Sequence, residues 1–375
     1  MKHGINIIRL CLLWPLINSS ICVPTVATGD PDLKDISLPE GFIITLYAED
    51  VKNARAMCWG EKGTLFVGSR SAGLVHALKD TDNDGTADEI HLIAKGLNMP
   101  AGVAFKDGDL YVSSVDRIVR LKDIEDHLSD PPDPEVVIRD YPSETHHGWK
   151  FIAFGPDGKL YIPVGAPCNV CEREEPIYST ITRVNTDGSD RQIVAKGVRN
   201  TVGFDWHPIT GELWFTDNGR DHMGDDVPPC ELNRLGTEGQ HFGFPYCHGK
   251  NISDPEFKGE LPCEKYAQPE LEMQAHTAPL GMRFYSGNAF PEKYKNAMFI
   301  AQHGSWNRSS PVGYQVIVAF QAPDGKVSSE VFASGWLKGS RATGRPVDVL
   351  VAPDGSLLVS DDSADRIYKI SYVGR

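Results

Sequence analysis

The sequence has little positive charge and no long apolar run. Its 375 residues hold 37 lysines and arginines against 51 aspartates and glutamates, a formal net charge of -14. Surfaces that bind nucleic acid or anionic membranes depend on clustered Lys and Arg, so we expect neither partner, and any anionic ligand must meet a local basic cluster. A membrane-spanning helix needs about 20 apolar residues, and no run reaches that length. We therefore expect no membrane span.

A short apolar run near the N-terminus is typical of an export signal. Lys2 and Arg9 precede "LCLLWPLI", small residues follow, and Ala27 is a plausible cleavage position. We expect residues 1–27 to be a signal peptide and the protein to be secreted or periplasmic. A buried N-terminal helix stays open as an alternative, as does lipid attachment at Cys22, although the isoleucine before it is a poor residue for that processing.

Cysteine is also scarce, with eight in the chain. Cys11 and Cys22 fall in or next to the expected signal, and the other six allow 15 pairings in an oxidising compartment. Cys168 and Cys171 form a "CNVC" motif without the following histidine of a haem attachment site and without a second pair at zinc-finger spacing. A local disulfide is the favoured interpretation. Cys58, within the apolar segment "AMCW", is interpreted as a buried thiol.

A hairpin pattern recurs six times in the chain. Each copy has a short apolar run, a turn rich in Gly, Asp and Pro, and a second run rich in Leu, Val and aromatic residues, which is the signature of a β-hairpin. The copies are "AMCWGEKGTLFVGS" (56–69), "GVAFKDGDLYVSS" (102–114), "FIAFGPDGKLYIPVG" (151–165) and the segments 203–219, 281–304 and 347–362.

Further strand candidates turn each hairpin into a larger unit. A third strand follows five of the hairpins, as in "LVHALK" and "RIVRLK", and a fourth follows in segments such as "IHLIAKG" and "EVVIRDY". Repeated four-stranded antiparallel units are the blades of a β-propeller. Segment 42–50, "FIITLYAED", resembles a fourth strand but precedes the first hairpin. We predict an all-β fold: one six-bladed β-propeller over 38–375, closed by its N-terminal and C-terminal strands.

Propeller geometry predicts where polar residues gather. The first strand of each blade lines the central channel and the second runs back, so the starts of first strands and the ends of second strands share one mouth. We predict a cavity there that contains acids, bases and several cations. The starts supply Asn98, His146, His147, Arg199, Asn200, His276 and Arg345, and the ends supply Arg70, Asn169, 217–221, 302–308, Asp361 and Asp362.

These residue types suggest acid–base chemistry on an anionic or carbonyl ligand. His147 is a candidate general base, because an unperturbed imidazole has a pKa near 6.5. Lys150, Arg199, Arg308 and Arg345 are candidate cations for cofactor carboxylates, or for a carbonyl that becomes anionic in a transition state. One such residue alone is usually an ordinary surface group. The convergence of several favours a functional site.

Six motifs in order carry a resemblance to a known family. They are "HHGWKFIAFGPDGKLY", "GVRNTVGFDWHP", "FTDNGRDHMGDDVPPCELN", "HFGFPYC", "QHGSWNRS" and "GRPVDVLVAPDGSLLVSDD". With them the sequence resembles the sorbosone dehydrogenase family, relatives of the soluble quinoprotein glucose dehydrogenases that bind pyrroloquinoline quinone (PQQ). The resemblance extends from about Leu38 to Tyr372.

The resemblance implies a PQQ-dependent oxidoreductase that oxidises a sugar, alcohol or aldehyde. His147 would take the hydroxyl proton while hydride passes to the quinone, and Arg199 with Asn200 would hydrogen-bond the quinone carbonyls. The electrons would pass on to an acceptor such as a quinone or a cytochrome. The glucose enzymes have an aspartate before the catalytic histidine where this chain has His146.

The resemblance also implies how PQQ and a calcium ion would be held. Arg345 matches an arginine that pairs with a cofactor carboxylate, and Arg308 is the expected substitute for a cofactor-binding lysine that has no clear equivalent here. The backbone carbonyls of Gly219 and Arg220 match the pair that binds calcium, although the glucose enzymes have Gly-Pro at that place.

A second calcium site is suggested by "DTDNDGTAD" (80–88). Asp80, Asp82, Asp84 and Asp88 fall at positions 1, 3, 5 and 9 of a calcium loop, with Gly85 at position 6 for the sharp turn. Position 12 is a histidine instead of the bidentate glutamate of an EF-hand. Weak calcium binding and a plain acidic turn are both left open.

Two other functional classes also fit a propeller. A calcium-dependent hydrolase or lactonase would hold one metal deep in the channel with Asn, Asp and Glu side chains, and the predicted mouth is richer in Arg and His than such a site needs. A propeller that binds protein or glycan without catalysis would use the same mouth. A visible chromophore would belong only to the quinoprotein.

Overall fold

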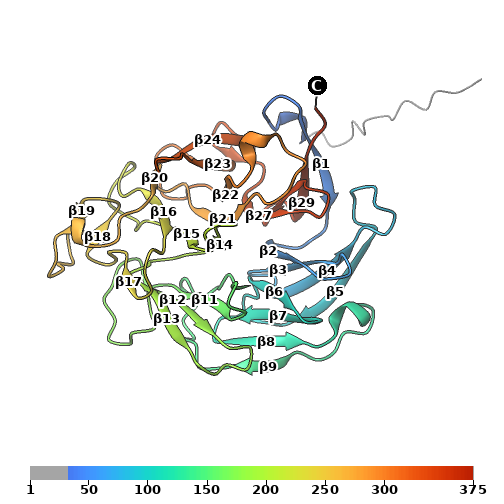
Figure 1. Ribbon diagram of the computed structural model, residues 1–375, viewed down its shortest axis with the longest axis horizontal. Coiled ribbons are helices and arrows are strands. Elements are labelled where there is room, and N and C mark those ends of the chain that lie inside the picture. Colours follow the sequence, from blue (N-terminus) through green and yellow to red (C-terminus); the bar gives the residue numbers. More distant parts are fainter. Residues whose placement is uncertain (1–32, 375) are drawn as a thin grey trace, which may run out of the picture.

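The computed structural model describes residues 33–374, which form a ring of six β-sheets around a central axis (Figure 1). Each sheet contains four antiparallel strands, and the third also takes up a short parallel strand. The predicted all-β, six-bladed propeller is confirmed. Residues 1–27, the expected signal peptide, lie outside the described residues, as do Cys11 and Cys22.

The first three blades follow one another along the chain. Blade 1 contains β2 (Ala54–Trp59), β3 (Leu65–Ser69), β4 (Leu74–Lys79) and β5 (Glu89–Lys95). Blade 2 contains β6 (Val103–Lys106), β7 (Asp109–Ser114), β8 (Arg117–Leu121) and β9 (Glu135–Ile138). Blade 3 contains β10 (Ala153–Phe154), β11 (Leu160–Val164), β12 (Thr180–Val184) and β13 (Gln192–Lys196), joined by β17 (Gln240–His241).

The other three blades complete the ring. Blade 4 contains β14 (Phe204–Trp206), β15 (Leu213–Asp217), β16 (Cys230–Arg234) and β20 (Leu271–Met273). Blade 5 contains β21 (Pro279–Phe284), β22 (Met298–Gln302), β23 (Gln315–Gln321) and β24 (Val327–Ser334). Blade 6 contains β27 (Pro346–Val351), β28 (Leu357–Asp361), β29 (Arg366–Tyr372) and β1 (Phe42–Ala48).

Short elements fill the connections. Two small hairpins pair β18 (Cys247–His248) with β19 (Ile252–Ser253) and β25 (Leu337–Lys338) with β26 (Arg341–Ala342). The helical segments among the described residues are single 3₁₀ turns, and none of them is long or apolar enough to cross a membrane. These turns are η1 (Leu33–Asp35), η2 (Ile124–Asp126), η3 (Cys263–Lys265) and η4 (Glu292–Tyr294).

The N-terminal strand closes the ring as predicted. β1 is the outermost strand of blade 6 and pairs antiparallel with β29, with Phe42 opposite Tyr372. The Phe42 ring lies edge-on to Phe290, Phe332 and Tyr294 of blade 5, with centroids 4.8, 5.1 and 5.5 Å away. The closing strand is therefore held by an aromatic core as well as by backbone pairing.

The first strands of neighbouring blades approach closely around the axis. A Cβ on Gly203, next to β14, would lie 2.2 Å from the carbonyl oxygen of Leu280 in β21, so only glycine fits there. Carboxylates also bridge first strands: the buried Asp348 of β27 accepts the Met57 amide of β2 at 2.9 Å, and the half-buried Asp205 of β14 accepts the Phe284 amide of β21 at 2.8 Å. Apolar side chains pack between the blades further out. The channel wall is thus rigid where the site is built.

Blade 4 contains the strands that the sequence pattern did not reveal. β16 is buried but carries polar side chains, and Glu231 accepts hydrogen bonds from the Asn233 side chain at 3.0 Å and the Gly249 amide at 2.7 Å. An insertion then separates β16 from β20. Because polar side chains and a long connection hide the alternation, no third or fourth strand was recognised here.

Two disulfides tie the loops of blades 3 and 4. Cys168 and Cys171 form the predicted local disulfide, and a second one joins Cys247 to Cys263 in the insertion of blade 4. Cys58 and Cys230 are free thiols, Cys58 half-buried and Cys230 buried.

Candidate active site

A cavity of about 550 Å³ opens at the predicted mouth of the channel. All six blades contribute to its wall, mostly through residues that precede a first strand or follow a second one, as the propeller geometry predicts. Its lining includes four arginines, three histidines and two tryptophans besides His147, and of these Trp306 is 69% exposed at the rim. The polar and aromatic lining residues are Arg55, Arg70, His146, His147, Trp149, Arg199, Asn200, Asn218, Asp221, His276, His303, Trp306, Asn307 and Arg345.

His147 is buried in this wall in a fixed tautomer. It lies in the turn before β10 with a left-handed φ of 49°, and its Nδ1 lies 2.8 Å from the carbonyl oxygen of Ala166. A carbonyl oxygen only accepts, so Nδ1 carries the proton and Nε2 keeps its lone pair. Burial, with the nearby positive charge of Arg199 and the ring of His146, holds the pKa of His147 well below its usual range. The imidazole is therefore neutral at pH 7.

His146 differs from its neighbour in position and surroundings. Its side chain is exposed, and its ring centroid lies 4.2 Å from that of His147 at a tilt of 60°. Burial and the charge of Arg199 lower its pKa. His146 therefore lines the rim of the cavity, whereas His147 lies in its wall.

Arg199 forms a rigid part of the wall. Its side chain donates to the Asn169 carbonyl at 2.8 Å, the Asn169 side-chain oxygen at 2.9 Å, the Asn218 carbonyl at 3.1 Å and the Asp221 carboxylate at 3.2 Å. Its backbone amide donates to Asp217 at 2.8 Å. These bonds fix the plane of the guanidinium against the cavity.

Two other predicted cofactor-binding residues keep donors available. The Asn200 backbone is tied to Asp217 at 2.6 Å, but its side-chain amide lines the cavity and has no hydrogen-bond partner between residues 33 and 374. Arg345 donates to the carbonyls of His303 at 3.1 Å and Gly304 at 2.6 Å. No carboxylate pairs with Arg345 in the described part of the chain, so its charge is uncompensated.

The structure places two predicted cofactor-binding cations outside the cavity. The Lys150 ammonium is buried beneath the wall and donates to the carbonyls of Val115 at 2.5 Å and Gly148 at 2.8 Å, and burial lowers its pKa to about 8. Arg308 pairs with Asp226 at 3.1 Å and also donates to the Asp225 carbonyl. Their bonds to loop carbonyls and acids could not be predicted from the sequence pattern. In this arrangement both stabilise loops beside the site.

The backbone carbonyls of Gly219 and Arg220 are free acceptors among the described residues. Gly219 lines the wall, and neither carbonyl oxygen accepts a hydrogen bond from a residue within 33–374. The Arg220 side chain turns away to pair with Asp254 at 2.5 Å and Glu256 at 2.7 Å, which anchors this segment. Two fixed carbonyls with unfilled lone pairs fit a calcium ion, which prefers oxygen ligands.

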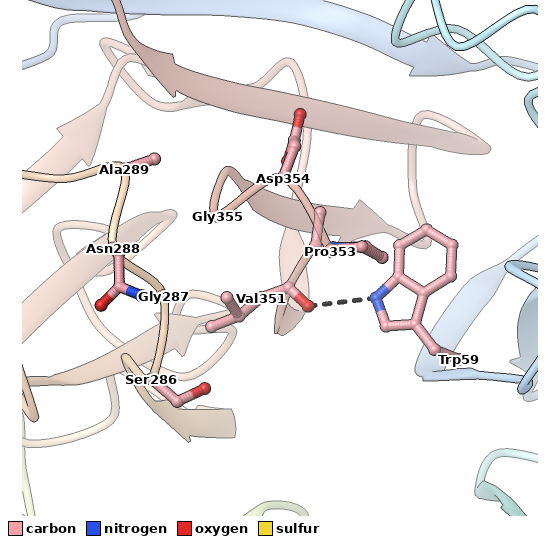
Figure 2. A pocket seen from close by; sticks show the side chains of 10 residues that line it. Trp59, Ser286, Gly287, Asn288, Ala289, Val351, Pro353, Asp354 and Gly355 are labelled. Carbon is pink, nitrogen blue, oxygen red and sulfur yellow. Dashed lines mark hydrogen bonds between the residues drawn. The ribbon is translucent and has the colours of Figure 1, made fainter.

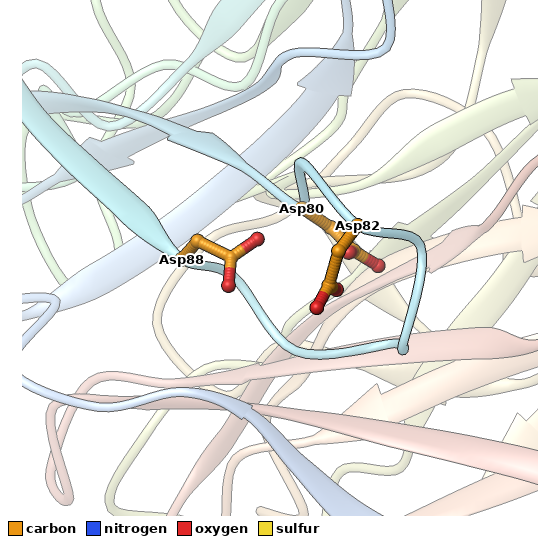
Figure 3. A group of neighbouring side chains, drawn as sticks. All are labelled: Asp80, Asp82 and Asp88. Carbon is orange, nitrogen blue, oxygen red and sulfur yellow. The ribbon is translucent and has the colours of Figure 1, made fainter.

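The acidic loop 80–88 lies between the outer strands β4 and β5, away from the cavity (Figure 3). Ligand oxygens of Asp80, Asp82 and Asp88 lie within 4.8 Å of one another. Asp84 is not part of this group, because its carboxylate caps the Thr86 amide at 2.8 Å. The structure thus brings together three of the four predicted ligands.

A second hollow, of about 620 Å³, lies at the opposite ends of the strands (Figure 2). It is formed by the turns 286–289 and 352–355 and by Trp59, whose indole donates to the Val351 carbonyl at 3.0 Å. Its one charged residue, Asp354, is paired with Lys369 at 2.8 Å. It therefore lacks the acid–base groups that distinguish the mouth.

Arg55 is a functional candidate that the sequence analysis missed, whereas Asp221, His303, Asn307 and Asp362 were placed at the mouth but given no role. Arg55 lies inside the channel and pairs with Asp362 at 2.9 Å, and Asp362 also accepts from His303 at 2.8 Å. Burial lowers the pKa of His303 to about 4. Asp221 links Arg199 to Asn307, whose side chain lies 2.7 Å away. The sequence feature that could have marked these residues as functional is their position next to the predicted strand ends.

The fold and the cavity place this chain among the six-bladed propellers that have a histidine and arginines at the channel mouth. Within this group, the chain belongs to the TrAA12-like family, whose model matches residues 36–373. An uncharacterised protein of Borreliella burgdorferi is 35% identical over 380 residues, covering 96% of this chain and 97% of that protein.

Solved structures share the fold. A structure of carbohydrate-active enzyme family AA12 from Trichoderma reesei has a TM-score of 0.78 at 18% identity, covering 90% of this chain and 97% of that chain. The holo form of the pyranose dehydrogenase PQQ domain from Coprinopsis cinerea has a TM-score of 0.74 at 18% identity, with the same two coverages of 90% and 97%. At this identity the similarity shows the fold.

Proposed function

We propose that the protein is a PQQ-dependent oxidoreductase that oxidises a sugar, an alcohol or an aldehyde. The observation that carries the proposal is the neutral, oriented His147 in a cavity wall that also contains Arg199 and Asn200. The shared fold with the PQQ domain of a pyranose dehydrogenase supports it. PQQ, when bound with calcium, supplies a two-electron acceptor for the hydride of a C–H bond.

The residues at the mouth fit this cofactor. Arg345 would bind a cofactor carboxylate, because its guanidinium has donors left and no carboxylate partner in the described chain. Asn200 and Arg199 would hydrogen-bond the quinone carbonyls. The carbonyls of Gly219 and Arg220 would bind calcium, since fixed, unpaired backbone oxygens are ligands of the kind that this ion prefers.

His147 would act as the general base. Its Nε2 takes the proton of the substrate hydroxyl, while its Nδ1–H keeps donating to the Ala166 carbonyl, which holds the ring in place. The charge of Arg199 disfavours a protonated ring in the resting state. The base is therefore ready at neutral pH, and it releases the proton readily after each turnover.

The finer features of the proposal come from the sequence. The six motifs favour relatives of the sorbosone dehydrogenases, a signal at residues 1–27 would make the protein secreted or periplasmic, and a quinone or a cytochrome would accept the electrons. The calcium-dependent hydrolase or lactonase is the main alternative. Among the described residues, Asp221 is the only carboxylate that lines the cavity, and it is already bonded to Arg199 and Asn307. This favours the quinoprotein over a metal site of acidic side chains.

Reconstitution tests the proposal. The purified apoprotein is titrated with PQQ, with and without calcium, while its visible spectrum is recorded, and the product is assayed with an electron-accepting dye on sugars, alcohols and aldehydes. We expect saturable PQQ binding, a visible chromophore and turnover of at least one class. His147→Ala serves as the control that should bind PQQ but turn over poorly. Lactone hydrolysis without PQQ would favour the hydrolase, and PQQ binding too weak to saturate would overturn the proposal.

A further inference from the structure

The four arginines of the cavity differ in their partners. Arg55 is paired with Asp362 at 2.9 Å and Arg199 with Asp221 at 3.2 Å. The Arg345 guanidinium contacts carbonyls and has no carboxylate partner among residues 33–374. The guanidinium of Arg70 makes no hydrogen bond and no ion pair with any residue in 33–374, although the Arg70 backbone amide donates to the Asn53 side-chain oxygen at 3.0 Å. Two positive charges of the lining are therefore uncompensated.

The guanidinium of Arg70 stacks on Trp149, next to the candidate base His147. Its guanidinium carbon lies 3.9 Å from the ring centroid of Trp149, and the Trp149 and His147 rings are 5.9 Å apart. Stacking covers one face of the guanidinium and leaves the N–H groups along its edge for hydrogen bonds. Its Nε is buried without a partner, and an unsatisfied buried donor is destabilising. The site is therefore suited to an acceptor that arrives with a ligand.

The net charge of the proposed cofactor and its calcium ion would balance one of the two unpaired arginines. This step rests on the proposed function. PQQ carries three carboxylates and calcium brings two positive charges, so together they add one net negative charge to a cavity with two uncompensated guanidinium groups. Arg345 is the residue that the family resemblance pairs with a cofactor carboxylate. Arg70 then remains as the unassigned cation of the lining, and only the Trp149 ring lies between it and the base.

We infer that Arg70 binds a carboxylate of the substrate, so that the enzyme acts on a sugar acid such as a uronic acid in preference to a neutral sugar. A planar guanidinium held in place recognises a carboxylate through two parallel hydrogen bonds. Trp149 contacts both Arg70 and His147, so the cation and the base are one side chain apart. The chain as a whole carries a net charge of -14, so only these local cations attract an anion.

Ligand binding to the apoprotein tests the inference without the cofactor. Calorimetric titrations compare D-glucuronate and D-galacturonate with their uncharged methyl esters and with glucose 6-phosphate, in the unmodified protein, Arg70→Gln and Arg70→Lys. We expect each uronate to bind at least about tenfold more tightly than its ester, as for one charged hydrogen-bonded pair. Arg70→Gln should abolish the difference and Arg70→Lys should keep part of it. Thermal melts verify that both variants fold.

Kinetics and cofactor binding give the second measurement. In the reconstituted enzyme the ratio of kcat/KM for uronate over neutral sugar should fall about tenfold or more in Arg70→Gln. The PQQ affinity of Arg70→Gln should stay near that of the unmodified protein, whereas Arg345→Gln should lower it.

Three results would overturn the inference. The first is that the unmodified protein binds the uronate and its methyl ester with equal affinity. The second is that it binds glucose 6-phosphate more tightly than the uronates. The third is that Arg70→Gln loses as much PQQ affinity as Arg345→Gln. None of them would refute the proposed oxidoreductase, which fails instead if PQQ does not bind or if no substrate is oxidised.

Discussion

The carbonyl oxygen of Ala166 lies 2.8 Å from Nδ1 of His147 and decides which nitrogen of that ring is free. The ring stays neutral because its pKa is held well below the ordinary 6.5 by burial and by the charge of Arg199. A base works only when unprotonated, so lowering its pKa moves the acid limb of activity to lower pH.

We therefore expect kcat/KM of the reconstituted enzyme to stay on its plateau at pH 6.5 and to decline only in more acidic solution. The measurement is a pH profile with a slow substrate, with PQQ binding followed at every pH. A midpoint at or above 6.5 would show that the base has an ordinary pKa or that another group controls the rate.

Replacing each of the two neighbouring histidines separates their roles. His147→Ala removes the positioned base and should lower turnover by about 10²- to 10⁴-fold while PQQ binding stays close to normal. His146→Ala, at the exposed rim, should change turnover far less. Dye-linked turnover and PQQ titration measure both. An inactive His146→Ala beside an active His147→Ala would reverse the assignment.

Arg199 should affect both binding and chemistry. Its guanidinium joins Asn169, Asn218 and Asp221, and would contact both the resting quinone and the anionic transition state. Arg199→Ala should therefore weaken PQQ binding and lower turnover of the saturated enzyme. Arg199→Lys keeps the charge but loses the forked contacts, so we expect it to recover affinity more than rate. Unchanged affinity in Arg199→Ala would remove Arg199 from the cofactor site.

Calcium removal should abolish PQQ-dependent turnover. The ion would be held by the carbonyls of Gly219 and Arg220, which no hydrogen bond occupies in the described residues. We expect activity to disappear after exhaustive dialysis against a chelator and to return with calcium. Elemental analysis of the dialysed protein must accompany the assay, because a slowly exchanging ion would mimic independence. Full activity in metal-free protein would contradict the assignment.

Stability should depend on the closing strand. Phe42→Ala empties the aromatic cluster around Phe290 and Phe332, and truncation of a buried phenylalanine costs about 3–5 kcal/mol. Ile43→Ala is the matched control, since the next side chain on β1 is 38% exposed. Urea unfolding measures both. Deletion of residues 38–50 should go further and leave β29 as an exposed, aggregation-prone edge, so an unchanged melting temperature would refute the closure.

Most of the fold could be predicted because it repeats. A hairpin with alternating apolar residues and a turn rich in Gly, Asp or Pro can be recognised in every blade. The segment "FIITLYAED" indicates the ring closure because it resembles a fourth strand but precedes the first hairpin. β16 remained hidden because its buried side chains include Glu231 and Asn233, which are joined by a hydrogen bond. Hydrophobic periodicity cannot distinguish a strand that contains such a polar pair from a loop.

The cavity could be predicted more reliably than its individual contacts. Strand topology brings His147, Arg199 and Arg345 to one mouth whatever their rotamers. The direction of a long side chain depends on its neighbours, and Lys150 reaches the Val115 carbonyl from another blade. Arg70 was placed at the mouth by the pattern, but its stacking on Trp149 depends on distances that sequence does not contain.

The pairing of β1 with β29 also determines when the ring can close during biosynthesis. The ribosome makes β1 before any complete blade and β29 after all the other strands of the ring, so the earliest strand waits unpaired throughout most of translation. Contacts so distant along the chain form late in folding. Because the wall of the cavity draws on all six blades, a nascent chain without blade 6 lacks part of that wall, and ligand loading has to follow the synthesis of β29.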